Sequence, residues 1–325
     1  MSVRTRGARL RRGVLAAMIT AALCGPVSAA AVPRTPAPAP AALPGLSADT
    51  LDVRYTANRG NIAEAAEMAK TAGDVQRGQA LTALAAADRH FLSFDGRGEG
   101  RAVEVLGDLA GADRISVLVP GSDTTLDTFD GLSSRIGGAA RSLQAQIHRQ
   151  APGAKVAVVA WLGYTPPKTI STDVLTTSRA EDGARELRAF VSSVERVNSG
   201  ARVSLMCHSY GTVVCGRAAS GLDVADIAVY GSPGTAAESL AGWGTTARVW
   251  AGRGEQDWIT YVPSASISVL GTTIGFGADP TSRGFGARVF ATGDAGHSDY
   301  LAPHSVSLTN LARIALGAAS DVTDD

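Results

Sequence analysis

Short, uninterrupted runs of apolar residues alternate with helical stretches over most of this 325-residue chain, and this alternation constrains the fold more than any other feature. Strands that are apolar throughout are buried on both faces, which is typical of a parallel sheet covered by helices on each side. The sequence therefore predicts an α/β fold with a mostly parallel central sheet. The expected strands span residues 115–119, 156–161, 203–207, 227–230, 248–251 and 287–291.

Apolar residues spaced three and four apart predict helices between these strands. The clearest helical face is made of Ala184, Leu187, Val191, Val194 and Val197. Three further helices are expected, one over residues 212–220, one with Leu132, Ile136, Leu143 and Ile147 on its apolar side, and a last one with Leu308, Leu311 and Ile314.

The region before these strands has a different pattern. Residues 50–88 are rich in alanine and helical in pattern, with a break near Gly73 and Asp74. The stretch HFLSFDGRGEGRAVEVLGDL follows, and it predicts two strands joined by a turn at residues 95–100. We therefore expect a helical N-terminal lead-in and two additional strands ahead of the alternating part.

The N-terminus has the pattern of a secretory signal peptide. Five arginines precede an apolar run at residues 13–24, and small residues follow at 27–31. The apolar run is short for a bilayer span, so we expect cleavage, secretion and no stable membrane insertion afterwards. An uncleaved membrane anchor is the alternative. The predicted organisation is a signal peptide at 1–30, a Pro/Ala-rich linker (VPRTPAPAPAALP) at 31–46 and one domain at 47–325.

Charge and motifs exclude several classes of partner. Removing residues 1–30 leaves 25 basic against 30 acidic residues, a net charge of about −5, and no basic run remains. Nucleic acid is therefore not an expected partner. No His or Cys pair has metal-ligand spacing, and no glycine-rich phosphate loop follows a strand, so no cofactor is expected.

Two cysteines remain in the mature chain, Cys207 at the end of a predicted strand and Cys215 on the predicted helix that follows. A disulfide needs Cα atoms within about 7 Å, which is closer than a strand and its packed helix usually come. We expect two buried free thiols.

Three residue types needed for nucleophilic catalysis follow strands of the predicted sheet. Ser209 comes after strand 203–207, Asp257 lies in the loop after the next strand but one, and His297 follows the last strand. Ligands bind at the carboxyl ends of parallel strands, so all three are expected at one edge. Serine needs a base to take its proton, and a carboxylate orients that base. The order Ser, Asp, His is that of the α/β-hydrolases.

Each residue has rivals nearby. His304 is the alternative base, whereas His208 is expected to point away because it is adjacent to Ser209. Glu255, Asp294 and Asp299 are alternative acids. Asp123 is interpreted either as a structural acid that caps the following segment or as a gate to the pocket.

The strand-to-helix turn at Ser209 needs small residues two positions before and after the serine. Gly211 fits, whereas Cys207 adds volume beneath the turn. The backbone N–H of Tyr210, at the start of the helix, is a candidate donor to an oxyanion. The second candidate is the N–H of Ser122, after the glycine that ends strand 115–119.

A run of motifs resembles a family of secreted bacterial α/β-hydrolases of unassigned substrate. The motifs are FLSFD, GRAVEVLGDL, VLVPGSDTTLDTFD, WLGYTPP, HSYG, YGSPG and GHSDYL, between Phe91 and Leu301. The resemblance implies an α/β-hydrolase fold with Ser209 as nucleophile and His297 as base. Cys207 departs from the usual GHSYG, which has glycine at that position.

The expected activity is hydrolysis of a carboxylic ester, with a small-molecule or lipid-like substrate, through an acyl-enzyme. The alternatives are a peptidase or acyltransferase on the same triad, and a non-catalytic secreted binding protein. Residues 259–285 are interpreted as a mobile cover or a plain surface insertion, with Leu270, Ile274 and Phe276 as an apolar substrate face. No pattern selects an acyl chain length or an oligomeric state.

Overall fold

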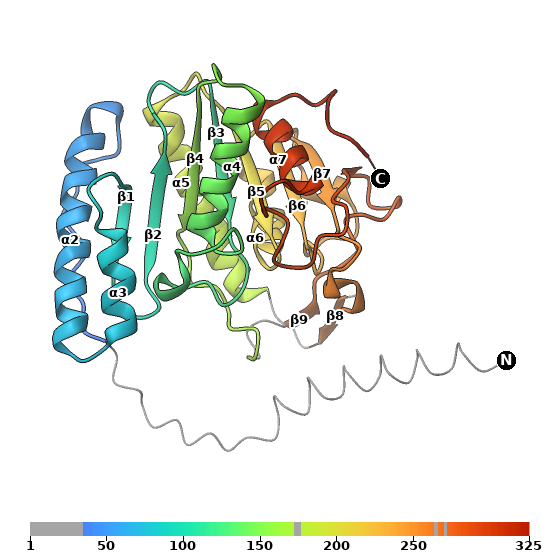
Figure 1. Ribbon diagram of the computed structural model, residues 1–325. Helices are drawn as coiled ribbons and strands as arrows, with labels where there is room; N and C mark the ends of the chain where they lie inside the picture. The colour runs from blue at the N-terminus through green and yellow to red at the C-terminus, as the bar shows by residue number, and fades with distance from the viewer. Residues whose placement is uncertain (1–34, 172–176, 263–265, 270–271, 325) are drawn as a thin grey trace.

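The computed structural model describes residues 35–171, 177–262, 266–269 and 272–324. Its centre is an eight-stranded sheet with strand order β1-β2-β4-β3-β5-β6-β7-β10 (Figure 1). The strands are β1 (His90–Asp95), β2 (Arg101–Leu106), β3 (Arg114–Val119), β4 (Val156–Leu162), β5 (Arg202–His208), β6 (Asp226–Tyr230), β7 (Arg248–Gly252) and β10 (Arg288–Val289).

The predicted parallel sheet is confirmed. Every pairing from β4 across to β10 is parallel, whereas β2 pairs antiparallel with both β4 and β1. In the centre of the sheet, Val117 of β3 lies opposite Val159 of β4 and Leu205 of β5. The parallel strands therefore end at a common edge, which carries the loops that follow β3, β5 and β7.

The last predicted strand, residues 287–291, is shorter than expected. Only Arg288 and Val289 pair with β7. The chain then leaves the sheet, because the amide of Ala291 bonds to the carbonyl of Thr323 in the C-terminal tail instead. Because β10 runs parallel to β7, the loop that follows it, with His297, starts at the carboxyl edge of the sheet.

Helices cover both faces of the sheet (Figure 1). Helices α5 and α6 pack on one face, and α4 and α7 pack on the other. Within the described part of the chain, no helix has both the length and the apolar character needed to span a membrane. The helices are α2 (Leu51–Thr71), α3 (Val75–Leu84), α4 (Ile136–Gln150), α5 (Ser178–Val197), α6 (Gly211–Ala218) and α7 (Val306–Leu316).

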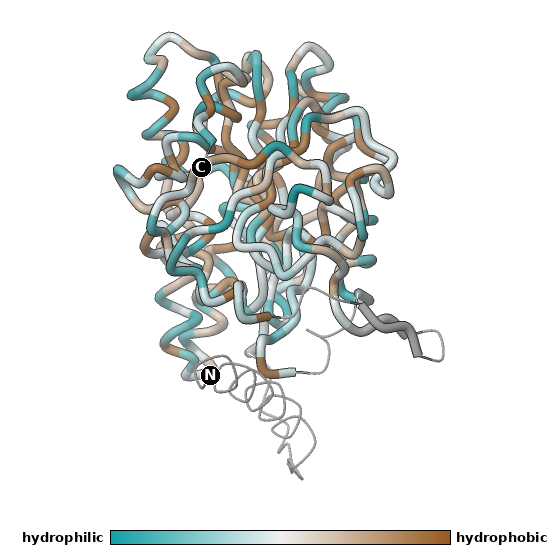
Figure 2. The backbone as a smooth tube through the Cα atoms, turned by 90° about the vertical axis from the view of Figure 1, so that its right-hand side faces the viewer, coloured by the Kyte–Doolittle hydropathy of each residue, from teal (hydrophilic) through white to brown (hydrophobic). Residues whose placement is uncertain are grey.

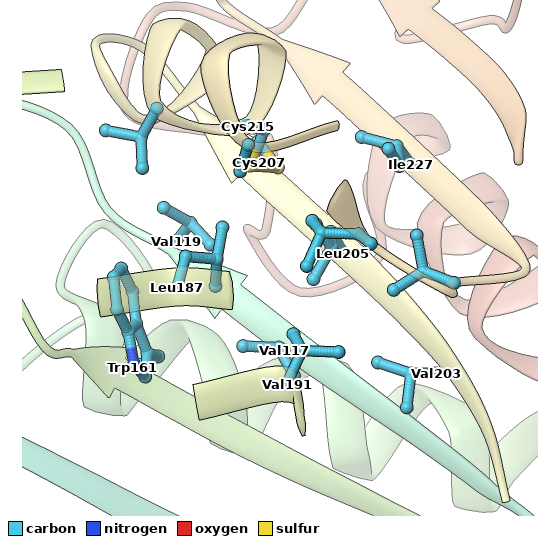
Figure 3. Packing of buried hydrophobic residues seen from close by; sticks show 14 of the residues in the cluster. Val117, Val119, Trp161, Leu187, Val191, Val203, Leu205, Cys207, Cys215 and Ile227 are labelled. Carbon is cyan, nitrogen blue, oxygen red and sulfur yellow. A yellow bond between two sulfur atoms is a disulfide. The ribbon is translucent and has the colours of Figure 1, made fainter. Parts of the chain in front are cut away.

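The core consists of two apolar layers separated by the sheet. Because side chains alternate along a strand, Val117 and Val119 face α5 and α6, whereas Leu118 faces α4 and α7. Figure 3 shows the first layer, where Leu187 and Val191 of α5 pack over the strands. In Figure 2, most hydrophobic segments of the backbone lie in the middle of the molecule, whereas hydrophilic segments lie mainly at its periphery.

One residue predicted on the apolar side of α4 lies outside that helix. Leu132 is 81% exposed, in a turn where the amide of Arg135 bonds to its carbonyl. The helix begins only at Ile136, because the preceding residue, Arg135, is extended, with a φ of −103° and a ψ of 144°. Leu143 and Ile147 are buried as expected.

The helical lead-in forms a hairpin of α2 and α3 along strand β1 (Figure 1). The predicted break occurs at Gly73, with φ +82°, and the side chain of Asp74 caps α3 by accepting the amide of Arg77 at 3.0 Å. The described residues of the Pro/Ala-rich segment lie against α2, where Asn61 donates to the carbonyl of Ala39 at 2.9 Å. The predicted signal peptide lies outside the described residues, and the domain boundary stays a prediction.

Candidate active site

Ser209 occupies a sharp turn between β5 and α6. Its φ is +53°, which is uncommon for a residue with a side chain and indicates local strain. The amide of Ser209 still bonds to the carbonyl of Tyr230 at 3.1 Å, so the strand pairing continues up to the turn. A Cβ atom at Gly211 would lie 2.5 Å from the carbonyl oxygen of Val119. The small residue expected two positions after the serine is therefore required by the close approach of α6 to β3.

The prediction of free thiols is wrong, because Cys207 and Cys215 form a disulfide (Figure 3). Their Cα atoms are 6.5 Å apart, within the range that a disulfide allows. The expected strand-to-helix spacing does not apply here, because Cys215 lies in the second turn of α6, where the tight turn keeps the helix close to the strand. The side chain of Cys207, beneath the turn, is therefore bonded covalently to Cys215 of α6.

The three side chains predicted at the sheet edge lie in one hydrogen-bonded chain. His297 Nε2 is 2.9 Å from Ser209 Oγ, and His297 Nδ1 is 2.9 Å from Asp257 Oδ1. A carboxylate only accepts, so Nδ1 carries the proton and Nε2 is left to accept the hydroxyl proton. The side chain of Asp257 is fully buried and that of His297 is 13% exposed. This geometry allows the imidazole to remove a proton from Ser209.

Asp257 is held as an anion by three donors. Burial favours its neutral form, but hydrogen bonds from His297, Tyr300 and the amide of Ile259 together keep its pKa below the ordinary value. Tyr300 Oη donates to Oδ2 at 2.5 Å, and the Ile259 amide donates to Oδ1 at 2.8 Å. Sequence reasoning did not identify Tyr300, although it lies in the motif GHSDYL.

The rival residues take other positions. Glu255, Asp294 and Asp299 are exposed, and His297 contacts Asp257 instead. His304 lies just before α7, and the histidine within hydrogen-bond distance of Ser209 is His297. The expectation that His208 points away from the site is wrong. Its Nε2 lies 2.8 Å from the backbone oxygen of His297. The end of β5 therefore contacts the loop that precedes α7.

The loop after β3 lies directly against the serine. A Cβ atom at Gly121 would be 2.6 Å from Ser209 Cβ, so only glycine fits at this position. The next residue, Ser122, is the predicted oxyanion donor on this side. Tyr210, the donor predicted on the other side, is the N-cap of α6. Its side chain is buried, and its Oη accepts a hydrogen bond from the amide of Ala180 at 3.1 Å.

Asp123 links two loops at this edge. Its carboxylate accepts the amide of Thr169 at 3.0 Å, and its own amide donates to the carbonyl of Pro167 at 3.1 Å. Asp123 thus fastens the loop after β3 to the loop after β4. Its role is structural, but its carboxylate bonds to Thr169 rather than capping the segment that follows it. Its φ of +60° is a second strained backbone position beside Ser209.

The segment at 259–285 is partly anchored to the core. It contains the short strands β8 (Ser266–Val269) and β9 (Thr272–Gly275), which form an antiparallel pair. Phe276 is buried with its ring edge-on to Tyr210 at 5.7 Å, so it belongs to the core rather than to a substrate face. Leu270 lies outside the described residues, and the side chain of Ile274 is not described.

An aromatic side chain lies beside the base. Trp258 starts the short helix η6 (Trp258–Tyr261), is 50% exposed, and has its ring centroid 4.5 Å from that of His297.

Two surface cavities, of about 290 and 750 Å³, lie away from these residues, and Arg101 and Thr165 line both of them. Among the residues that the structure describes, no three His, Cys, Asp or Glu side chains cluster as metal ligands would.

A family model described as alpha/beta hydrolase matches residues 95–267, more than half of the chain. The chain belongs to the alpha/beta hydrolase family. The matched region of this alpha/beta hydrolase includes Ser209 and Asp257 and ends before His297. The predicted fold is therefore confirmed, with its mostly parallel sheet and helical lead-in.

Curated relatives match this alpha/beta hydrolase over only part of their own length. An uncharacterized protein of Mycobacterium tuberculosis strain H37Rv is 28% identical over 262 residues, covering 70% of this chain and 39% of the relative. An uncharacterized protein of Mycobacterium bovis is 32% identical over 136 residues, covering 40% of this chain and 51% of the relative. The chain thus spans about half or less of the length of these relatives.

Solved structures of similar shape include serine hydrolases. An alpha/beta serine hydrolase without lid from Xanthomonas campestris covers 72% of this chain and 96% of its own, with a TM-score of 0.42 and 15% identity. Esterase PE8 covers 65% of this chain and 95% of its own, with a TM-score of 0.41 and 18% identity. These scores are too low to add to the assignment, which rests on the family match.

Proposed function

We propose that this alpha/beta hydrolase is a secreted serine hydrolase that cleaves carboxylic esters. The observation that carries the proposal is the continuous hydrogen-bond chain from Ser209 through His297 to Asp257. A weak nucleophile, a neutral base and a buried carboxylate are the three groups that acyl transfer from an ester requires. Their separations of 2.9 Å fit direct proton transfer from serine to imidazole.

In the proposed reaction, Ser209 Oγ attacks the ester carbonyl carbon while its proton moves to His297 Nε2. The carbonyl oxygen becomes an oxyanion, which accepts hydrogen bonds from the backbone amides of Tyr210 and Ser122. As the C–O bond breaks, His297 returns the proton to the leaving alcohol and an acyl-enzyme remains. Water then attacks the acyl-enzyme with its proton taken by His297, and the acid leaves as Ser209 is regenerated.

Exposed apolar side chains on the loops at this edge of the sheet support an apolar ester substrate. Trp258 packs beside the base, and Tyr261, on the same short helix, is 70% exposed. Ile170 is 90% exposed and follows Thr169, whose amide donates to Asp123 in the loop after β3. These exposed apolar side chains suit an ester with apolar groups better than a charged substrate.

The disulfide supports the proposed export. Disulfides persist in oxidising compartments, and the bond between Cys207 and Cys215 suits a protein that leaves the reducing cytoplasm. N-terminal sequencing of the exported protein tests this part of the proposal. A mature N-terminus near residue 31 is expected, and retention of residues 1–30 would contradict cleavage.

The activity is tested with a fluorophosphonate probe and a series of p-nitrophenyl esters, using Ser209→Ala as the control. Wild-type protein should be labelled and should hydrolyse esters, and Ser209→Ala should lose both, with a rate at least about 10³-fold lower. Absence of labelling in folded wild-type protein would favour a binding protein. Labelling without ester turnover would favour a peptidase or an acyltransferase.

A further inference from the structure

His208 connects the nucleophile turn to the loop that carries the base. It directly precedes Ser209, and its Nε2 lies 2.8 Å from the backbone oxygen of His297, 89 residues further along the chain. A carbonyl oxygen only accepts hydrogen bonds, so His208 Nε2 carries a proton and donates it. The final residue of β5 thus holds the backbone of the base by a direct bond.

The His208 ring is confined by its neighbours. It stacks on Tyr230, with ring centroids 5.3 Å apart, and lies 5.9 Å from the ring of Tyr300. A Cβ atom at Gly231 would come within 3.2 Å of both His208 Nε2 and Asp257 Oδ2. This tight packing leaves the ring little freedom to turn away from the carbonyl that it bonds.

We propose that His208 is a positioning residue, which holds His297 at hydrogen-bond distance from Ser209; the role rests on the function proposed above. Asp257 orients the imidazole, but the location of that ring also depends on the backbone of the loop between β10 and α7. That loop has no regular helix or strand, and it contains Gly293 and Gly296. The hydrogen bond from His208, which is adjacent to Ser209, therefore fixes the position of His297 relative to Ser209.

The charge state of His208 fits this role. Burial, together with the nearby His297, lowers the pKa of His208 to about 3. The ring therefore stays neutral at the pH values where an imidazole base works, and it adds no positive charge beside His297. A neutral donor supports the base without opposing the positive charge that the base gains during reaction.

Two substitutions separate the hydrogen bond from the packing. His208→Phe keeps a flat ring against Tyr230 but removes the donor, whereas His208→Gln keeps an N–H group near the position of Nε2. With p-nitrophenyl esters, we expect kcat of His208→Phe to fall by about tenfold to a hundredfold with KM within about twofold, because a displacement of about 1 Å costs that much. His208→Gln should keep most of kcat. Wild-type kcat in His208→Phe, or equal losses in both variants, would overturn the proposal.

Measurements that do not depend on activity distinguish failure of this proposal from failure of the proposed function. If wild-type protein shows no Ser209-dependent turnover, the function fails, and amide hydrogen exchange at residues 296–299 still tests His208. Faster exchange in His208→Phe than in His208→Gln supports the role, and equal rates overturn it. If His208→Phe does not fold, nitrogen NMR of wild-type protein decides: a proton on Nε2 of His208 supports the proposal and one on Nδ1 alone rejects it.

Discussion

The turn that carries Ser209 is tightly packed at two neighbouring glycines, where no side chain fits. Its neighbours Gly121 and Gly211 are glycines because a Cβ at the first would meet the serine itself and a Cβ at the second would meet the carbonyl of Val119. The hydroxyl is thereby held between the loop after β3 and His297, and the strained φ of +53° places it at the turn. The position of single atoms at this site is therefore set by close contacts as well as by hydrogen bonds.

Gly121→Ala should disable the nucleophile without unfolding the protein. The new Cβ would lie 2.6 Å from Ser209 Cβ and 3.0 Å from Oγ, so the serine must move away from His297. We expect the rate of fluorophosphonate labelling to fall by about a hundredfold. The matched control is Gly153→Ala, at a glycine with open space around it, which should label at the wild-type rate. An unchanged labelling rate in Gly121→Ala would contradict the close approach of this loop.

At the level of elements, the disulfide joins β5 to α6 directly under the turn that carries Ser209 (Figure 3). The two cysteines are eight residues apart in sequence, and both are fully buried. The bond therefore closes a short loop that contains Ser209. It limits how far the strand and the helix separate when the rest of the fold loosens.

Removing this bond should destabilise the protein by about 2–3 kcal/mol, as expected from the chain entropy of a loop this short. The measurement is guanidinium unfolding of oxidised wild-type protein, reduced wild-type protein and the double variant Cys207→Ala/Cys215→Ala. The reduced protein and the double variant should unfold at similar, lower denaturant concentrations. If reduction leaves the midpoint of the wild type unchanged, the disulfide is either absent or without effect on stability.

Across the whole molecule, titratable groups packed within the candidate site connect its geometry to stability. His208 faces His297, Asp257, Tyr230 and Tyr300, and its pKa is lowered to about 3. In the unfolded chain, a histidine has a pKa of about 6.5. Between about pH 6.5 and about pH 3, the unfolded chain binds a proton that the folded protein does not. The free energy of unfolding must therefore decrease as the pH falls through this range.

We expect the slope from His208 to reach about 1.4 kcal/mol per pH unit, which is the value for one proton. Asp257, whose pKa is lowered, adds a loss of stability only below about pH 4, where its unfolded form takes up a proton. Chemical denaturation of wild-type protein and His208→Gln between pH 4 and pH 7.5 tests this. The variant should show a shallower decrease, and identical slopes would exclude His208 as the source.

Local patterns alone predicted most of the architecture. Continuous apolar runs predicted the parallel strands, because burial on both faces leaves no polar alternation. The chain order of Ser209, Asp257 and His297 at strand ends predicted their meeting, because parallel strands end at one edge of a sheet. Gly211 was predicted as a small residue from the geometry of a strand-to-helix turn, and the structure places it against a backbone carbonyl.

Only the tertiary structure decided the features that depend on distances between separate segments. The approach of Cys215 to Cys207, the bond from His208 to the backbone of His297 and the donation from Tyr300 to Asp257 join residues whose separation no local pattern reports. A sequence specifies which residues follow a strand, because that depends on neighbours along the chain. How closely two such loops pack depends on the twist of the sheet and the volume of the side chains between them, and that is settled only when the whole chain is folded.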